Sequence, residues 1–166
     1  MQIEIGLADK RLQARDPFEW AGRVLSHFAC AEQAIGRLSL ALDLPIEKGA
    51  LSNLADLRNR LVAAEDRHCS ALNNRIARWM SHRPVRHLLA HATIHQLTDL
   101  AGRDVVITRH LPRDRDDVTP DRMWTSEERE ELLRQATSDS RSISDQVSNL
   151  LSDKALVAKL KRHQPR

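Results

Sequence analysis

Apolar side chains recur every three or four residues in the first half of the chain. Over residues 17–42 this spacing predicts an amphipathic helix, with Asp16 as its N-cap and Pro17 in its first turn. A second helix is predicted over residues 51–64, where leucines repeat at the same intervals. A third is predicted from the apolar positions Leu72, Ile76, Trp79 and Met80.

The pattern changes after a short fourth helix, which Pro84 opens over residues 83–92. Its apolar side consists of Val85, Leu88, Leu89 and Ala92. The segments 92–100 and 103–111 then carry β-branched residues in alternation and flank an Ala101-Gly102 turn, which predicts a small β-hairpin. Residues 112–123 are dense in charge and proline, so we expect a solvated loop there.

A long last helix is predicted after this loop. Thr125 and Glu128 have the spacing of a capping box, and helical periodicity continues from Leu132 to Leu150. The basic residues 159–166 are expected to form a frayed tail. Residues 1–15 are expected to be an N-terminal extension. They lack the apolar region of a secretion signal, so secretion is not expected.

Composition favours one mainly helical domain over the whole chain, residues 1–166. Hydrophobic residues make up 41% of the 166 positions, but there are only two Phe and no Tyr, so the core must be built mostly from aliphatic side chains. The chain is 30% charged and has five glycines, which argues against a disulfide scaffold and against a strand-rich sandwich. Cys30 and Cys69 have no paired spacing, so we expect two buried, reduced thiols.

Hydropathy indicates where the protein is found, whereas its net charge does not identify a partner. No segment approaches the length of apolar sequence that a membrane span needs, which predicts a cytoplasmic protein without membrane contact. The formal net charge is +3. Such a weakly basic balance permits a polyanionic partner without identifying one.

The polar face of the helix over residues 83–92 carries Arg86, His87 and His91. At about 100° per residue, Arg86 and His91 fall opposite the apolar stripe, and His87 lies beside His91. A guanidinium binds phosphate through two donors, and an imidazole transfers protons near neutral pH. RNA carries its own nucleophile, the 2′-hydroxyl, so such a set can cleave a phosphodiester bond without a metal ion.

The spacing Arg86-x4-His91, with a polar residue directly after the arginine, resembles the Arg-x4-to-6-His pattern of HEPN domains. The sequence RHLLAHA looks like the end of that family's helix. The hairpin, the sequence WTSEEREELL and the long last helix are similar to many bacterial HEPN-like proteins. One departure is Ala92, which stands where a glycine often follows the histidine. The resemblance covers most of the chain in architecture, but its defining motif is only two residues.

This resemblance implies a fold of the all-α class, or mainly so. It would be a HEPN-like bundle of four to five helices with a small β-hairpin after the fourth helix. It also implies a homodimer in which two such helices face each other and cut RNA without metal or another cofactor. Arg86 would orient the scissile phosphate, His91 would act as general acid or base, and His87 would occupy the polar position after the arginine. RNA, a second copy and an antitoxin or regulatory protein are the implied partners, because such proteins often act in toxin–antitoxin or phage-defence systems.

Glu32 is a further candidate, since it falls within the apolar arc of the first helix, between Phe28 and Ile35. A carboxylate in that position needs a partner. The family often has an acidic residue on this helix near the active cleft, which implies that Glu32 orients Arg86 or His91. The alternative is that Glu32 lies at the edge of the core and reaches solvent.

Three alternatives remain open for the helix over residues 83–92. Arg86 and His91 are also explained as solvated side chains. Three histidines at steps of four, His87, His91 and His95, would share a helical face and could ligate a metal ion. Against a zinc site, the β-branched residues after position 92 favour an earlier helix end, and no HExxH sequence is present. Lastly, a HEPN-like dimer without nuclease activity would bind a protein or a nucleic acid instead.

Overall fold

The structure, a computed structural model, describes residues 16–46, 49–110 and 120–162. Within these ranges it contains six helices and one antiparallel sheet with the strand order β1-β2-β3. The helices are α1 (Pro17–Ala41), α2 (Leu54–Ala63), α3 (Arg67–Met80), α4 (Arg83–His91), α5 (Ser126–Ser152) and α6 (Lys154–Arg162). The strands are β1 (Ala92–Thr98), β2 (Asp104–His110) and β3 (Arg122–Trp124).

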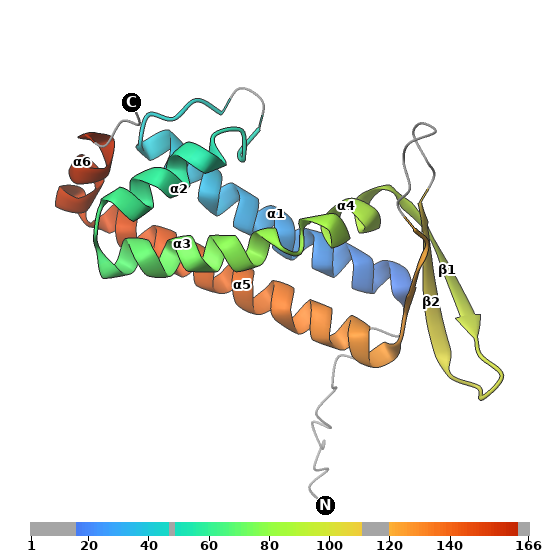
Figure 1. Cartoon of the computed structure of the whole chain (residues 1–166). Helices are drawn as coiled ribbons and strands as arrows, with labels where there is room; N and C mark the ends of the chain where they lie inside the picture. Colours follow the sequence, from blue (N-terminus) through green and yellow to red (C-terminus); the bar gives the residue numbers. More distant parts are fainter. Residues whose placement is uncertain (1–15, 47–48, 111–119, 163–166) are drawn as a thin grey trace, which may run out of the picture.

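The two longest helices, α1 and α5, pack against each other along the length of the bundle (Figure 1). The Trp20 indole N–H donates to the carbonyl oxygen of Arg129 at 2.9 Å, and His27 Nδ1 lies 3.2 Å from Ser140 Oγ. Both contacts join a residue of α1 to a residue of α5 further along the chain, so the two helices run in the same direction. α3 runs back against α5, and α4 continues this return along α1.

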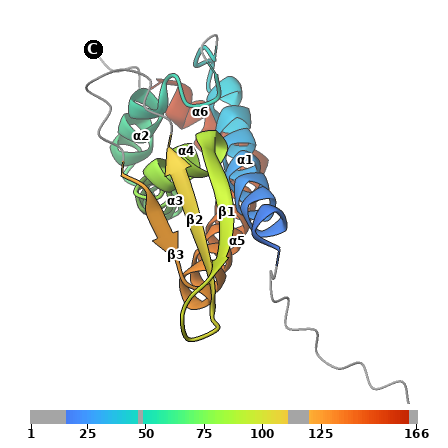
Figure 2. The ribbon, with the colours of Figure 1, turned by 90° about the vertical axis from the view of Figure 1, so that its right-hand side faces the viewer.

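The small sheet covers the end of the bundle at which α1 and α5 begin (Figure 2). The inward face of β2 is formed by Val106, Thr108 and His110, which are all buried. Thr108 Oγ1 accepts a hydrogen bond of 3.0 Å from the Trp124 indole, which satisfies the buried hydroxyl. Trp124 also meets Trp20 edge to face, with ring centroids 5.3 Å apart, and this contact fixes the sheet on the bundle.

Several local predictions are confirmed. The protein is mainly helical, and Asp16 caps α1 by accepting from the backbone N–H groups of Phe18 and Glu19. The capping box of Thr125 and Glu128 at the start of α5 is present. The hairpin forms at the predicted place, and α4 has nearly the predicted bounds. These elements have caps and periodicity within a single stretch of sequence, which explains why they could be predicted.

The end of the chain differs from the prediction. Residues 154–162 form α6, so residues 159–162 of the predicted frayed tail are helical, and the described part of the chain has six helices where four to five were expected. The side chain of Leu160 is fully buried. Lys159 donates to the carbonyl oxygen of Ala64, and Lys161 lies 2.8 Å from a carboxylate oxygen of Asp43. These contacts with distant parts of the chain hold the basic helix against the bundle, whereas its own sequence indicates only an exposed, charged segment. Residues 163–166 lie outside the described residues.

Other corrections concern the predicted loop and the cysteines. Arg122 and Met123, placed in the loop over 112–123, belong to strand β3, while residues 111–119 and the predicted extension 1–15 lie outside the described residues. Cys30 is exposed on α1, contrary to the prediction, whereas Cys69 is buried and free as expected. Burial, with the neighbouring charge of Asp66, raises the pKa of the Cys69 thiol to about 11, so that thiol stays protonated. Among the helices of the described ranges, none combines the length and the apolar character needed to cross a lipid bilayer.

The N-cap of α3 leads to a prediction about stability. Asp66 accepts from the backbone N–H groups of His68 and Cys69 at 2.8 and 3.1 Å, and the bond from Cys69 is the main cause of its lowered pKa. We expect Asp66→Ala to lower the free energy of unfolding by about 1 kcal/mol at pH 7 and Asp66→Asn to lower it less. The stabilisation is present above the unfolded pKa of about 4 and disappears as the pH falls through the lowered folded pKa. Urea unfolding of the wild type and the two variants at pH 7 and pH 3 measures the loss of stability and its pH dependence. If Asp66→Ala loses as much unfolding free energy at pH 3 as at pH 7, the prediction is wrong.

Candidate functional site

Helix α4 carries the residues that the sequence singled out. Leu88 and Leu89 are buried in the core and fix the helix against α1. Pro84 lies in its first turn, where the missing N–H leaves no hydrogen bond unmade. The helix ends at Ala92, whose backbone is extended at φ −86° and ψ 153° because β1 begins there. Any residue adopts this conformation, so the position does not require a glycine.

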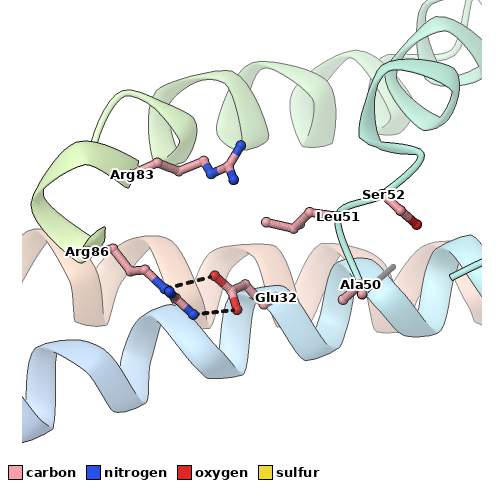
Figure 3. Close-up of a pocket in the computed structure, with 7 residues that line it drawn as sticks. Glu32, Ala50, Leu51, Ser52, Arg83 and Arg86 are labelled. Atoms are coloured by element: carbon pink, nitrogen blue, oxygen red, sulfur yellow. Dashed lines mark hydrogen bonds and ion pairs between the residues drawn. The ribbon is translucent and has the colours of Figure 1, made fainter. Parts of the chain in front are cut away.

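Glu32 and Arg86 form an ion pair across α1 and α4 (Figure 3). Arg86 Nε lies 3.3 Å from Glu32 Oε1, and Nη2 donates to Oε2 at 3.4 Å. The side chains are 38% and 22% exposed, so the pair lies at the rim of the core. Glu32 therefore contacts Arg86, one of its two expected partners, and holds one edge of the guanidinium. The other edge, which includes Nη1, is the part that an incoming phosphate would contact.

An open pocket of about 350 Å³ adjoins this ion pair. Its walls are Glu32, Arg83 and Arg86 on the two helices and the loop residues Gly49, Ala50, Leu51 and Ser52. In Figure 3 the Arg83 side chain extends from α4 toward the loop. The loop can lie close to α1 because Gly36 has no side chain. A Cβ atom at this position would stand 3.0 Å from the Ala50 Cβ. The pocket therefore depends on contacts between three separate parts of the chain.

His91 is the last residue of α4, directly before β1, and His87 lies one turn earlier, next to Arg86 in sequence. His91 is exposed, and its ring centroid is 4.6 Å from that of His87. His87 in turn lies 5.9 Å from His110 of β2. His91 does not line the pocket of Arg86, since five residues along a helix turn the side chain by about 140°. Within one chain the structure thus does not bring the predicted arginine and histidine into a single pocket.

The alternative of a helical metal site is not supported. His95 lies in strand β1, so the three histidines at steps of four do not share one helical face. As expected from the β-branched residues, α4 ends before this position. In the parts of the chain that the structure describes, no group of three or more His, Cys, Asp or Glu side chains is placed to hold a metal ion.

Arg83 was missed by the sequence analysis, although a charge count would have indicated its surroundings. Residues 67–98 contain five arginines and five histidines but no Asp or Glu. The remaining positions hold 21 basic and 23 acidic residues, so the excess positive charge is concentrated in this segment. Arg75 and Arg86 pair with carboxylates of other helices, whereas no carboxylate among the described residues pairs with Arg78 or Arg83.

The arrangement has two chemical capacities. The guanidinium groups beside the pocket can bind a phosphate, and the exposed imidazole of His91 can transfer a proton. The two groups lie on different sides of α4, so a polymer that crosses the helix, or two helices side by side, would be needed to use both. Comparison of this chain with models of protein families, with curated proteins and with solved structures found no match.

Proposed function

We propose that this protein is a metal-independent endoribonuclease of the HEPN type, which acts through α4 at a cleft between two copies of the chain. The observation that carries the proposal is the ion pair between Glu32 and Arg86, which fixes a guanidinium beside an open pocket on the helix that bears His91. The absence of acidic residues from positions 67–98 adds a surface that attracts a polyanion.

In the proposed reaction the 2′-oxygen of a ribose attacks the adjacent phosphorus, and the bond from phosphorus to the 5′-oxygen breaks. The products are a 2′,3′-cyclic phosphate and a 5′-hydroxyl. Arg86 binds the phosphate and stabilises its developing charge. His91 takes the proton of the 2′-hydroxyl as general base or gives a proton to the leaving 5′-oxygen as general acid, and water exchanges the other proton. His87 lies against His91 and positions its ring. Since Arg86 and His91 of one chain point to different sides, we propose that each cut uses the arginine of one copy and the histidine of the other.

The competing proposal is a nucleic-acid-binding module without catalysis. Its support is that Arg86 already has a carboxylate partner and that His91 does not line the pocket of Arg86. In that case the segment 67–98, which has no acidic residues and is called the acid-free segment below, would bind phosphates. The histidines would then take no part in a reaction. The toxin or phage-defence role and an antitoxin or regulatory partner follow from the resemblance alone, and the cytoplasmic location follows from the apolar pattern of the sequence. All three stay part of the proposal.

Incubation of the purified protein with end-labelled RNA in EDTA tests the function. We expect cleavage that EDTA does not abolish and fragments that end in 2′,3′-cyclic phosphates. Arg86→Ala and His91→Ala proteins purified in the same way control for contaminating nuclease. RNA that is bound but left intact by the wild type would favour the binding module, and cleavage that EDTA removes would contradict the proposed chemistry.

A further inference from the structure

Among the described residues, the side chains beside the pocket of α4 leave one positive charge uncompensated. Three of these residues line the pocket with charged groups: Glu32, Arg83 and Arg86. Glu32 and Arg86 neutralise each other in their ion pair. Arg83 is exposed, and no carboxylate among the described residues lies within ion-pair distance of it. The charge that the pocket offers to a ligand is therefore that of Arg83, and an anion is the ligand it favours.

The geometry of α4 places both arginines at this pocket. Arg83 and Arg86 are three residues apart, so their side chains leave neighbouring points on one face of the helix, about 5–6 Å apart at Cβ. Arg83 is the first residue of α4, where the positive end of the helix dipole adds to its charge. Ser52 also lines the pocket, but its hydroxyl donates to the carbonyl oxygen of Pro45 at 3.2 Å. The cavity of about 350 Å³ has room for a phosphate group with part of its sugar.

We propose that this pocket is a subsite for a backbone phosphate of the RNA strand next to the phosphate that is cut, with Arg83 as its main contact. The inference rests on the proposed ribonuclease function and adds a residue that the Arg86-His91 motif does not contain. In this arrangement Arg86 would stand between the two phosphates: Glu32 holds its Nε and Nη2, and Nη1 would contact the substrate. Arg83 is thereby a positioning residue, which sets where along the strand the scissile bond lies.

A phosphate within a strand suits this pocket better than a free anion. The pocket is open, and its single net charge gives little affinity for an isolated ion in physiological salt. A phosphate in RNA that is already bound along the acid-free segment reaches the pocket at a high effective concentration.

The test measures binding of a short, non-cleavable 2′-O-methyl RNA at several salt concentrations. We expect Arg83→Ala to weaken binding about tenfold and to reduce the slope of log K against log salt by about 0.7, the value for one lost phosphate contact on a single strand. Arg83→Lys should keep most of the slope, since it keeps the charge. The control Arg141→Ala removes an exposed arginine of α5, outside the pocket, and should change the slope by much less.

Two further measurements sharpen the result. Glu32→Gln leaves the charge of Arg86 uncompensated and should bind the RNA several-fold more tightly, while it cleaves more slowly because Arg86 loses its support. Inorganic phosphate and AMP serve as separate probes: tight binding of either that depends on Arg83 would assign the pocket to a small ligand and overturn the inference. Equal slopes for Arg83→Ala and Arg141→Ala would overturn it as well.

Failure of the subsite and failure of the ribonuclease proposal are distinguishable. Binding of non-cleavable RNA does not require catalysis, so a loss of affinity in Arg83→Ala supports the subsite even if the wild type cuts nothing. Conversely, if the wild type cleaves RNA and Arg83→Ala cleaves it with an unchanged KM and unchanged cut sites, the ribonuclease stands and the subsite is wrong.

Discussion

His91→Ala is expected to cleave RNA about 10²- to 10⁴-fold more slowly than the wild type, the usual effect of removing a general acid or base. His91 is the last residue of α4 and is exposed, so the substitution leaves the core intact. The measurement is the single-turnover rate on labelled RNA in EDTA, with unfolding curves to verify the fold. His68→Ala removes another exposed histidine, on α3 and outside the pocket of Arg86, and should cleave at the wild-type rate when the protein is in saturating excess over the RNA. Equal rates for His91→Ala and the wild type would remove His91 from the mechanism.

Arg86→Ala is expected to be comparably slow, and the pair of variants tests whether the site is shared between copies. If each cut uses Arg86 of one copy and His91 of the other, a mixed dimer of the two variants contains one intact site and one doubly altered site. Mixing the two inactive proteins, with time for exchange of subunits, should then restore about half of the wild-type activity in each mixed dimer, and about a quarter in a statistical mixture of the three dimers. Mixed dimers that form but stay inactive would show that both residues act from the same chain.

The helices that begin with a clear cap could be predicted, because the residues that determine them lie within single stretches of sequence. The cap at Asp16 and the capping box at Thr125 are such determinants. Strand β3 could not be predicted, since it has only three residues and exists through the contact of Trp124 with Thr108. Helix α6 was missed for the same reason, because what holds Leu160 is buried surface from elsewhere in the chain.

The candidate site was likewise predictable only in part. A carboxylate in the apolar arc of α1 indicated that Glu32 has a partner, but that partner, Arg86, lies 54 residues away and periodicity does not identify it. Motif spacing drew attention to Arg86 and away from Arg83, whose place at the pocket depends on the loop of residues 49–52 and on Gly36 beneath it. The absence of acidic residues from 67–98 is the one signal in the sequence that would have included Arg83.

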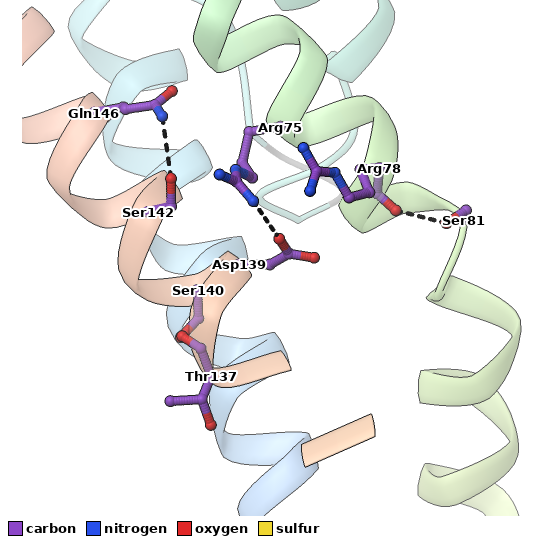
Figure 4. A network of polar contacts seen from close by, with 8 residues as sticks. All are labelled: Arg75, Arg78, Ser81, Thr137, Asp139, Ser140, Ser142 and Gln146. Atoms are coloured by element: carbon purple, nitrogen blue, oxygen red, sulfur yellow. Dashed lines mark hydrogen bonds and ion pairs between the residues drawn. The ribbon is translucent and has the colours of Figure 1, made fainter. Parts of the chain in front are cut away.

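The largest effect on stability is expected at the ion pair that joins α3 to α5. Arg75 Nη1 donates to Asp139 Oδ1 at 3.0 Å, and the Asp139 side chain is only 5% exposed, against 23% for Arg75 (Figure 4). Arg75→Met keeps the aliphatic stem of the side chain but leaves a buried carboxylate without its cation. We expect this substitution to lower the free energy of unfolding by about 3 kcal/mol, measured by urea denaturation at pH 7.

Arg78 provides the matched control, because it lies one turn further along α3, is exposed and has no carboxylate partner among the described residues (Figure 4). Arg78→Met should change the free energy of unfolding by at most about 0.5 kcal/mol. The double variant Arg75→Met, Asp139→Leu removes the buried charge as well and should regain most of the stability, since an apolar pair of similar volume replaces the ion pair. If Arg75→Met is no less stable than Arg78→Met, water reaches Asp139 and the ion pair does not hold the two helices together. If the double variant is as unstable as Arg75→Met, the loss comes from packing and not from an unpaired charge.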